Sequence, residues 1–97
     1  MHVSLSDEAE ADADDAIDWY IGEGAPAAAD DFLNELDHAL ELLHTNPEMG
    51  KSGPHQTHIL PLHSFPYSLV YRSQPNTLRV IAIAHHSRRP GFWAGRR

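Results

Sequence analysis

The side chains best suited to chemistry gather at the C-terminal end of the sequence. Residues 85–97 read HHSRRPGFWAGRR and bring together two imidazoles, four guanidinium groups and two large aromatic rings. Guanidinium groups donate paired hydrogen bonds to phosphate or carboxylate oxygens, and an aromatic ring stacks on a base or fills a pocket in a partner. Imidazole changes its charge near neutral pH, so His85 and His86 are candidates for proton transfer. The segment therefore predicts a surface that recognises another molecule.

The acidic residues occupy the other half of the chain. All 14 aspartates and glutamates lie in positions 1–50 and all 7 lysines and arginines lie in positions 51–97, which leaves a net charge of −7. This asymmetry predicts two faces with different partners, although the acidic half could instead serve only to keep a small protein soluble. A strong RNA binder would normally be more basic overall.

Composition also limits the kind of site and the compartment. The chain has 97 residues, which predicts a single domain over positions 1–97, and it has no cysteine, which excludes disulfides and thiolate metal sites. One histidine pair, His55 and His58, is three apart on an expected strand and so points to opposite faces. We therefore expect no metal and no cofactor. No apolar run is long enough to span a membrane and the N-terminus is polar, so the expected location is the cytoplasm, without membrane contact.

Two helices are predicted in the acidic half. Ser6 is a suitable N-cap for a helix of about 16 residues, and GEGAP at 22–26 supplies glycines to end it and a proline to begin the next. The second helix, of about 18 residues, ends at Asn46-Pro47. So short a link makes the two helices an antiparallel hairpin. Its expected core consists of Ala9, Ala13, Ala16, Ile17, Trp19, Tyr20 and Ile21 in the first helix, and Phe32, Leu33, Leu36, Ala39, Leu40 and Leu43 in the second.

Strands are predicted in the basic half, after a loop at 46–54. Residues 57–63 and 67–73 have the composition of strands, with Pro61 expected at an edge or a bulge. Residues 77–86 are almost continuously apolar, so both faces of this strand should be covered.

Together these elements predict an α+β fold. The first residues, MHVSLS, alternate apolar and polar side chains and indicate a short strand. The expected order is β-α-α-β-β-β: an N-terminal strand, then an antiparallel two-helix hairpin packed on a largely antiparallel sheet of about four strands. A short C-terminal tail follows the last strand.

Three local patterns, in this order of elements, resemble the RelE/ParE superfamily of type II toxin-antitoxin toxins. FPYSLVYR at 65–72 looks like the Phe-Pro-Tyr-x-apolar-x-Tyr-Arg strand of that family. LRVIAIAHHSRRPGFW at 78–93 is similar to its last strand followed by His-x-x-Arg-x-Pro-x-aromatic-Trp. NPEMG at 46–50 looks like the Pro-x-x-Gly that ends its second helix. The resemblance covers essentially the whole chain, and the ParE-like branch is the most similar.

By this resemblance, the end of the last strand and the tail after it carry the surface that acts on the target. His85, Arg88, Pro90 and Trp93 match the motif position by position. An alternative for the aromatic pair Phe92 and Trp93 is that both rings fold back and cap the open end of the core. The candidate target-binding residues are His85, His86, Arg88, Arg89, Pro90, Phe92, Trp93 and Arg96.

The resemblance implies one of two activities. ParE-like members resemble inhibitors that dock on DNA gyrase and trap its cleaved complex, which requires no bond-breaking residue. RelE-like members cut mRNA on the ribosome, and for that reaction Arg72, His85 and Arg88 are the candidate catalytic residues. Such nucleases resemble one another in a tyrosine near the C-terminus, which this chain lacks. The chain also has Thr57 and His58 where they often have arginine. Docking is therefore favoured over the ribonuclease.

The resemblance also implies a cognate antitoxin that holds the toxin inactive. The acidic outer face of the helices can accept a basic segment, with Asp12, Asp15 and Asp18 as candidate contacts. A small domain also gains stability when a partner covers its remaining apolar surface. The expected partners are thus an antitoxin and DNA gyrase, or an antitoxin and the ribosome with its mRNA.

Overall fold

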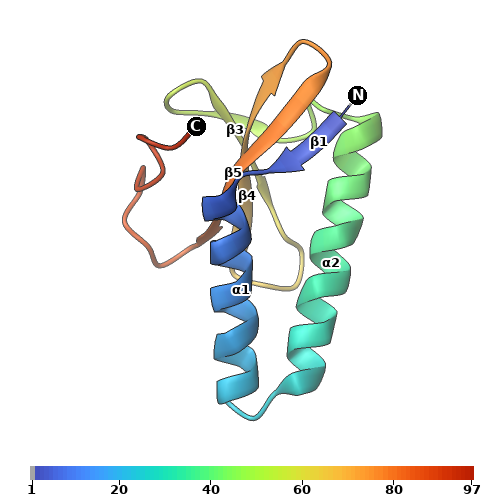
Figure 1. Cartoon of the computed structure of the whole chain (residues 1–97), viewed down its shortest axis with the longest axis vertical. Coiled ribbons are helices and arrows are strands. Elements are labelled where there is room, and N and C mark those ends of the chain that lie inside the picture. The colour runs from blue at the N-terminus through green and yellow to red at the C-terminus, as the bar shows by residue number, and fades with distance from the viewer. Residues whose placement is uncertain (1) are drawn as a thin grey trace.

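A computed structural model describes residues 2–97, which form five strands and two helices (Figure 1). The elements are β1 (His2–Leu5), α1 (Asp7–Gly22), α2 (Pro26–Thr45), β2 (Lys51–Gly53), β3 (Thr57–Pro61), β4 (Tyr67–Gln74) and β5 (Thr77–His85). The predicted α+β fold and the order of its elements are confirmed, and the sheet has one strand more than the four expected.

Both helices begin and end where local chemistry requires. The Ser6 hydroxyl accepts a hydrogen bond from the backbone N–H of Ala9 at 3.1 Å and so caps α1, as predicted. At the other end Gly24 has a φ of 73° and its N–H donates to the carbonyl of Ile21, a closure that needs a left-handed residue. Pro26 then opens α2. Within residues 2–97 neither helix is long and apolar enough to cross a membrane.

The sheet has the order β1-β5-β4-β3-β2, with β1 parallel to β5 and every other pair of neighbours antiparallel. The additional strand, β2, lies in the segment predicted as a loop. It pairs over only three residues, with Thr57–Ile59, which is too short to leave a recognisable alternation in the sequence. Pro61 ends β3 beyond the last residue paired with β2, so its predicted edge position is confirmed.

The turn after α2 requires glycine at position 50. The N–H of Gly50 donates to the hydroxyl of Tyr71 at 2.8 Å. A Cβ atom at this position would lie 2.8 Å from the same oxygen and 3.0 Å from the carbonyl oxygen of Ile59. The approach of the backbone to β3 and β4 therefore excludes any larger residue.

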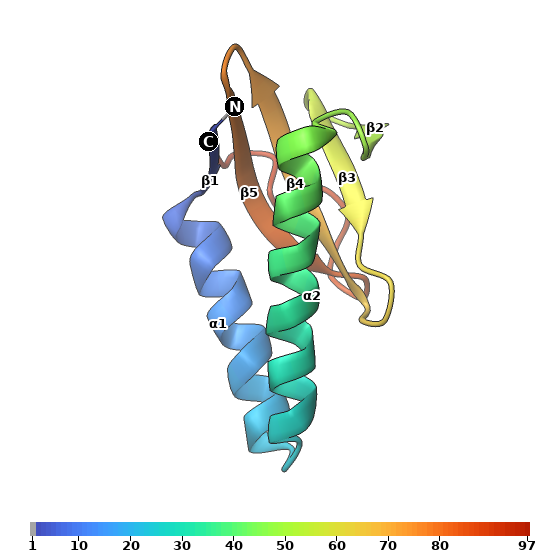
Figure 2. The same cartoon turned by 90° about the vertical axis from the view of Figure 1, so that its right-hand side faces the viewer.

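The helix hairpin covers one face of the sheet (Figure 2). Phe32 lies at the centre of this contact, with its ring 5.6 Å from that of Phe65 and 5.2 Å from that of Tyr67, in edge-to-face geometry. The buried residues of this core are Ala9, Ala13, Ala16, Phe32, Leu36, Ala39, Leu43, Leu62, Tyr67, Leu69, Tyr71, Leu78, Val80 and Ile83.

Three residues of the predicted helical core are exposed instead, and their predicted burial is wrong. Trp19 is 58 % exposed, Ile21 55 % and Leu33 37 %. Both views show the hairpin extending beyond the sheet, so the sheet does not cover its tip (Figures 1 and 2). Trp19 also lies to one side of the buried stripe: at about 100° per residue, Ala13 and Ala16 lie within about 40° of Ala9 around the helix, but Trp19 lies about 80° from it.

The C-terminal tail, residues 86–97, covers the opposite face of the sheet (Figure 2). A turn at Pro90-Gly91, in which Gly91 has a φ of 76°, directs the chain back over the strands. The prediction that both faces of β5 are covered is confirmed. The second cluster of buried residues consists of Val70, Ile81, Ala82, Ala84 and Trp93.

Candidate functional site

Arg96 fastens the C-terminal tail to α1. Its guanidinium lies 2.6 Å from the carboxylate of Asp12 and 3.3 Å from that of Glu8, and it also donates to the carbonyl of Ile81 at 3.1 Å. Asp12 in turn accepts a hydrogen bond from the backbone N–H of Ile83 at 3.1 Å. Because β1 pairs with only the first part of β5, these two side chains satisfy backbone groups on the remaining edge of β5.

Two further arginines hold the end of the tail by its backbone. Arg72 donates to the carbonyl of Arg96 at 2.6 Å and to that of His55 at 3.2 Å. Arg79 donates to the carbonyl of Arg97 at 3.3 Å. The tail is therefore a fixed part of the fold rather than a free basic arm.

Asp12 and Arg96 were predicted from the sequence to contact different partners, the antitoxin and the target respectively. In the structure they bind each other, and only 9 % and 15 % of their side chains are exposed. Asp15 and Asp18, the other antitoxin candidates, are exposed on α1. The acidic and basic halves of the chain thus meet in one place instead of forming two separate faces.

We expect Arg96→Ala to destabilise the protein by about 2 kcal/mol, because the change leaves the mostly buried Asp12 carboxylate without its cation. Urea unfolding measures the loss. Trypsin should also cut faster after Arg88, since the tail is then released. Arg97→Ala, at an exposed position, is the matched control and should change neither property. An unchanged cleavage rate in Arg96→Ala would show that Arg96 does not hold the tail.

Trp93 lies inside the protein rather than on its surface. It is 7 % exposed and packs in the second cluster, and its indole N–H has no hydrogen-bond partner within the described residues. Phe92 is half-buried against the same cluster. Trp93 thus folds back onto the sheet and caps the core, which is the alternative to target binding given above for this residue.

Arg88 is exposed and lies over the ring of Phe92, with its guanidinium carbon 3.7 Å from the ring centroid. This cation–π contact orients the guanidinium without using its hydrogen-bond donors. Within residues 2–97 the ion pairs involve Arg96, and no carboxylate pairs with Arg88. Arg88 is therefore oriented for an anionic partner. Arg89 and Pro90 beside it are exposed.

His85 is half-buried, and its ring is oriented by Ser87. The backbone N–H of Ser87 donates to Nδ1 of His85 at 3.0 Å, and the Ser87 hydroxyl lies 2.7 Å from the same nitrogen. Because a backbone N–H can only donate, the neutral ring carries its hydrogen on Nε2 and presents a donor there. His86, which is exposed, lies with Nε2 2.9 Å from the hydroxyl of Ser68.

A groove separates α1 from the end of β5. Its main part has a volume of about 540 Å³ and is lined by residues of α1, the loop before β4, and the end of β5. A second part of about 190 Å³ shares four of these residues and adds carboxylates from α1. We call this hollow the α1–β5 groove; its defining residues are Asp15, Trp19, Tyr67, His85 and Arg88.

Phenol groups in the groove stay neutral at physiological pH. Burial raises the pKa of Tyr67, and the charges of Tyr20 and Asp15 raise it further. Burial also raises the pKa of Tyr20. Tyr67 can therefore donate a hydrogen bond in a groove that the cation of Arg88 and the anion of Asp15 also line.

The three candidate ribonuclease residues do not form one cluster. His85 and Arg88 line the groove. Arg72 lies on β4 five residues beyond Tyr67, the partner of His85 in the sheet, which corresponds to roughly 16 Å along the strand. Its Nε and Nη1 donate to the loop before β3 and to the tail.

The two positions where arginine was expected for a nuclease have other roles. Thr57 is buried, and its hydroxyl donates to the carbonyl of Pro54 at 2.6 Å. His58 stacks on Tyr71 with 5.4 Å between ring centroids. Both residues stabilise the start of β3, and neither supplies a fixed cation.

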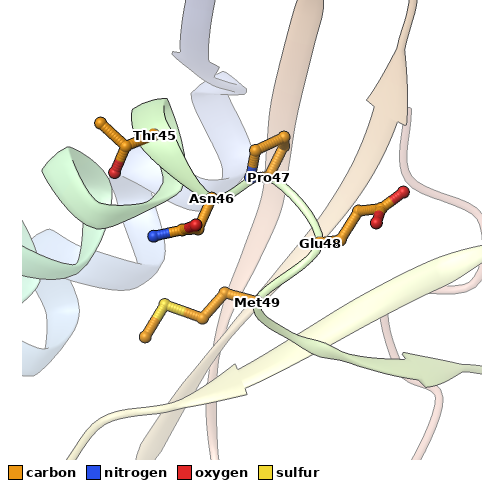
Figure 3. Close-up of a pocket in the computed structure, with 5 residues that line it drawn as sticks. All are labelled: Thr45, Asn46, Pro47, Glu48 and Met49. Carbon is orange, nitrogen blue, oxygen red and sulfur yellow. The ribbon is translucent and has the colours of Figure 1, made fainter.

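Other parts of the chain offer weaker candidates for a site. A hollow of about 400 Å³ at the end of α2 is lined by the consecutive residues Thr45, Asn46, Pro47, Glu48 and Met49 (Figure 3). Its one charged side chain, Glu48, extends away from Asn46 and Met49, so no reactive groups converge there. In the part of the chain that the structure describes, no three histidine or acidic side chains gather to hold a metal ion.

Comparison with known proteins identifies a family and a fold. Residues 3–90 match the family model of the ParE toxin of type II toxin-antitoxin system, parDE. Among solved structures, the chain is similar to one described as the chromosomal ParDE TA system from P. aeruginosa. The two share 20 % sequence identity and a TM-score of 0.78, over 88 % of this chain and 95 % of that chain, which shows a common fold. No curated protein sequence matches the chain.

Proposed function

The chain belongs to the ParE toxin family of type II toxin-antitoxin systems, and from this premise we propose that it stops bacterial growth by docking on a protein–DNA machine such as DNA gyrase. The proposed contact surface is the exposed part of the segment after β5, with Arg88 at its centre and His85 beside it. Trp93 and Arg96, by contrast, support this segment from within the fold.

One observation carries the choice of docking over mRNA cleavage. Arg88 is exposed, unpaired within residues 2–97 and oriented by Phe92, which suits binding to a carboxylate or phosphate group of a target. An endoribonuclease would also need a base close to that cation. His85 has its Nδ1 occupied by Ser87, and Arg72 lies at the other end of β4. These positions support recognition without bond breaking.

We further propose that a cognate antitoxin, encoded beside the toxin, binds the protein in the cytoplasm and neutralises it. The support from the chain itself is its charge and its exposed apolar surface. Asp15 and Asp18 are exposed on α1, and Trp19 lies on the same helix and is more than half exposed. A basic and partly apolar segment would cover such a surface favourably.

Induction of this protein alone should arrest the growth of a bacterial host, because no partner then covers the proposed contact surface. Growth curves after induction measure the effect, with soluble expression verified by a pull-down from the lysate. Co-expression of the small protein encoded by the neighbouring reading frame should restore growth. Unimpaired growth at high soluble expression would contradict the proposed toxin activity.

The target can be identified in the same cells. Docking on gyrase should produce linearised DNA and an SOS response, since breaks in DNA then persist. Primer extension on translated mRNA should show no new cuts. Cuts phased with the codons would instead establish the RelE-like ribonuclease, and the docking mechanism would have to be abandoned.

A further inference from the structure

The α1–β5 groove brings together residues that the sequence assigns to two different partners. Asp15, a candidate antitoxin contact, and Arg88 and His85, candidate target contacts, line the same hollow. They meet there because α1 packs beside β5, which ends at His85. The ion pair between Arg96 and Asp12, one turn before Asp15, holds the tail against the same helix. A partner that engages the acidic face of α1 at this point must therefore lie close to the basic contact surface.

The apolar part of the groove is built around Trp19. This side chain is 58 % exposed, and its ring meets that of Tyr20 edge to face at 5.1 Å between centroids. Pro66 and Tyr67 form further walls of the hollow. A large aromatic side chain at the edge of a groove, already oriented by a neighbour, is a typical anchor in a protein interface because binding buries much of its area.

The polar groups of the groove are suited to a ligand that carries both a negative and a positive charge. Arg88, the Nε2–H of His85 and the phenol of Tyr67 are donors suited to a carboxylate. Asp15 is suited to a lysine or arginine. A nucleic acid fits poorly, because the exposed carboxylates Asp14, Asp15 and Asp18 follow one another on α1. They lie within the range of about 8 Å over which charges act at physiological salt.

We propose that the α1–β5 groove binds a segment of the cognate antitoxin in which a large apolar side chain lies between a basic and an acidic one. The apolar side chain packs on Trp19, the basic one pairs with Asp15, and the acidic one pairs with Arg88. Neutralisation then consists of covering the contact surface directly. This inference rests on the proposed function, since it takes an antitoxin to be the partner.

The two tryptophans allow a direct test, because Trp19 is exposed and Trp93 is buried. In Trp93→Phe the fluorescence reports Trp19 alone. Adding the purified protein from the neighbouring reading frame should shift this emission to shorter wavelength and protect it several-fold from acrylamide quenching. If Trp93→Phe does not fold, the wild-type protein serves equally, since its quenchable fraction comes from Trp19.

Affinity provides the second measurement. Trp19→Ala should weaken binding of that antitoxin by about 30-fold, as expected for an interface anchor. Asp15→Lys should weaken it most at low salt. Ile21→Ala is the matched control: it removes an equally exposed apolar residue of α1 that lies outside the groove, and its affinity should stay within about twofold of wild type.

The outcomes separate this inference from the proposed function. If the two proteins associate but Trp19 stays as accessible to acrylamide as in the free toxin, the antitoxin binds elsewhere and the inference alone is wrong. If they do not associate at all, the toxin-antitoxin function is wrong as well. Protection of Trp19 by a single-stranded oligonucleotide, and not by the protein partner, would also overturn the inference.

Discussion

Trp93→Ala is expected to reduce the free energy of unfolding by about 3 to 5 kcal/mol, a large part of the roughly 5 to 15 kcal/mol that holds a domain of this size together. Trp93 is 7 % exposed and packs on Val70, Ile81 and Ala84. Truncation removes the largest side chain of the second cluster and exposes one face of β4 and β5 to water. Urea unfolding followed by circular dichroism measures the loss.

Trp19→Ala is the matched control, because it truncates the same kind of side chain at an exposed site. It should cost within about 1 kcal/mol. Trp93→Phe should also cost little, less than about 1.5 kcal/mol, since it keeps an aromatic ring and removes an indole N–H that is buried without a partner in the described chain. Equal losses for the two alanine variants, or the reverse order, would mean that the tail does not cap the sheet.

The two tryptophans also show how much of the fold can be predicted from the sequence alone. Helix ends were predictable because their signals are local: Ser6 caps α1 within three residues, and Gly24 and Pro26 separate the helices. The burial of Trp19 was predicted wrongly because Trp19 lies beside the buried stripe of α1 and because no sequence pattern reports where the sheet ends. Trp93 gave no periodic signal at all, since the tail that carries it has no regular secondary structure.

The candidate site was predictable only in part. The basic segment after β5 stands out in the sequence, but the contact between Asp12 and Arg96 joins residues 84 positions apart. No local rule connects such positions, and only the packing of α1 beside β5 brings them together. One signal was present: Asp12, Asp15 and Trp19 recur at i, i+3 and i+7, which places them on one face of α1. That spacing could have indicated a mixed surface at the edge of the core.

Arg88→Glu is expected to abolish growth arrest, because it replaces the one exposed arginine that Phe92 orients and the groove displays. Loss of such a cation at the centre of an interface typically costs more than about 2 kcal/mol of binding, or roughly 30-fold in affinity, and charge reversal adds repulsion from an acidic target site. The fold should persist, since the change removes an exposed cation–π contact of only about 0.5 to 1 kcal/mol.

Arg89→Glu is the matched control for Arg88→Glu. Arg89 is the next residue, carries the same charge and is exposed, but it does not line the groove. If toxicity depended only on the total positive charge of the tail, the two reversals would weaken it equally. If it depends on an oriented guanidinium, Arg89→Glu should remain toxic while Arg88→Glu does not. The toxicity of Phe92→Leu should then lie between those of the other two variants, because this change keeps the charge of Arg88 but removes the ring that orients it. Growth curves measure toxicity, and thermal melts check the fold of all three variants. Full toxicity of Arg88→Glu would show that the motif after β5 serves the fold and that the target is bound elsewhere.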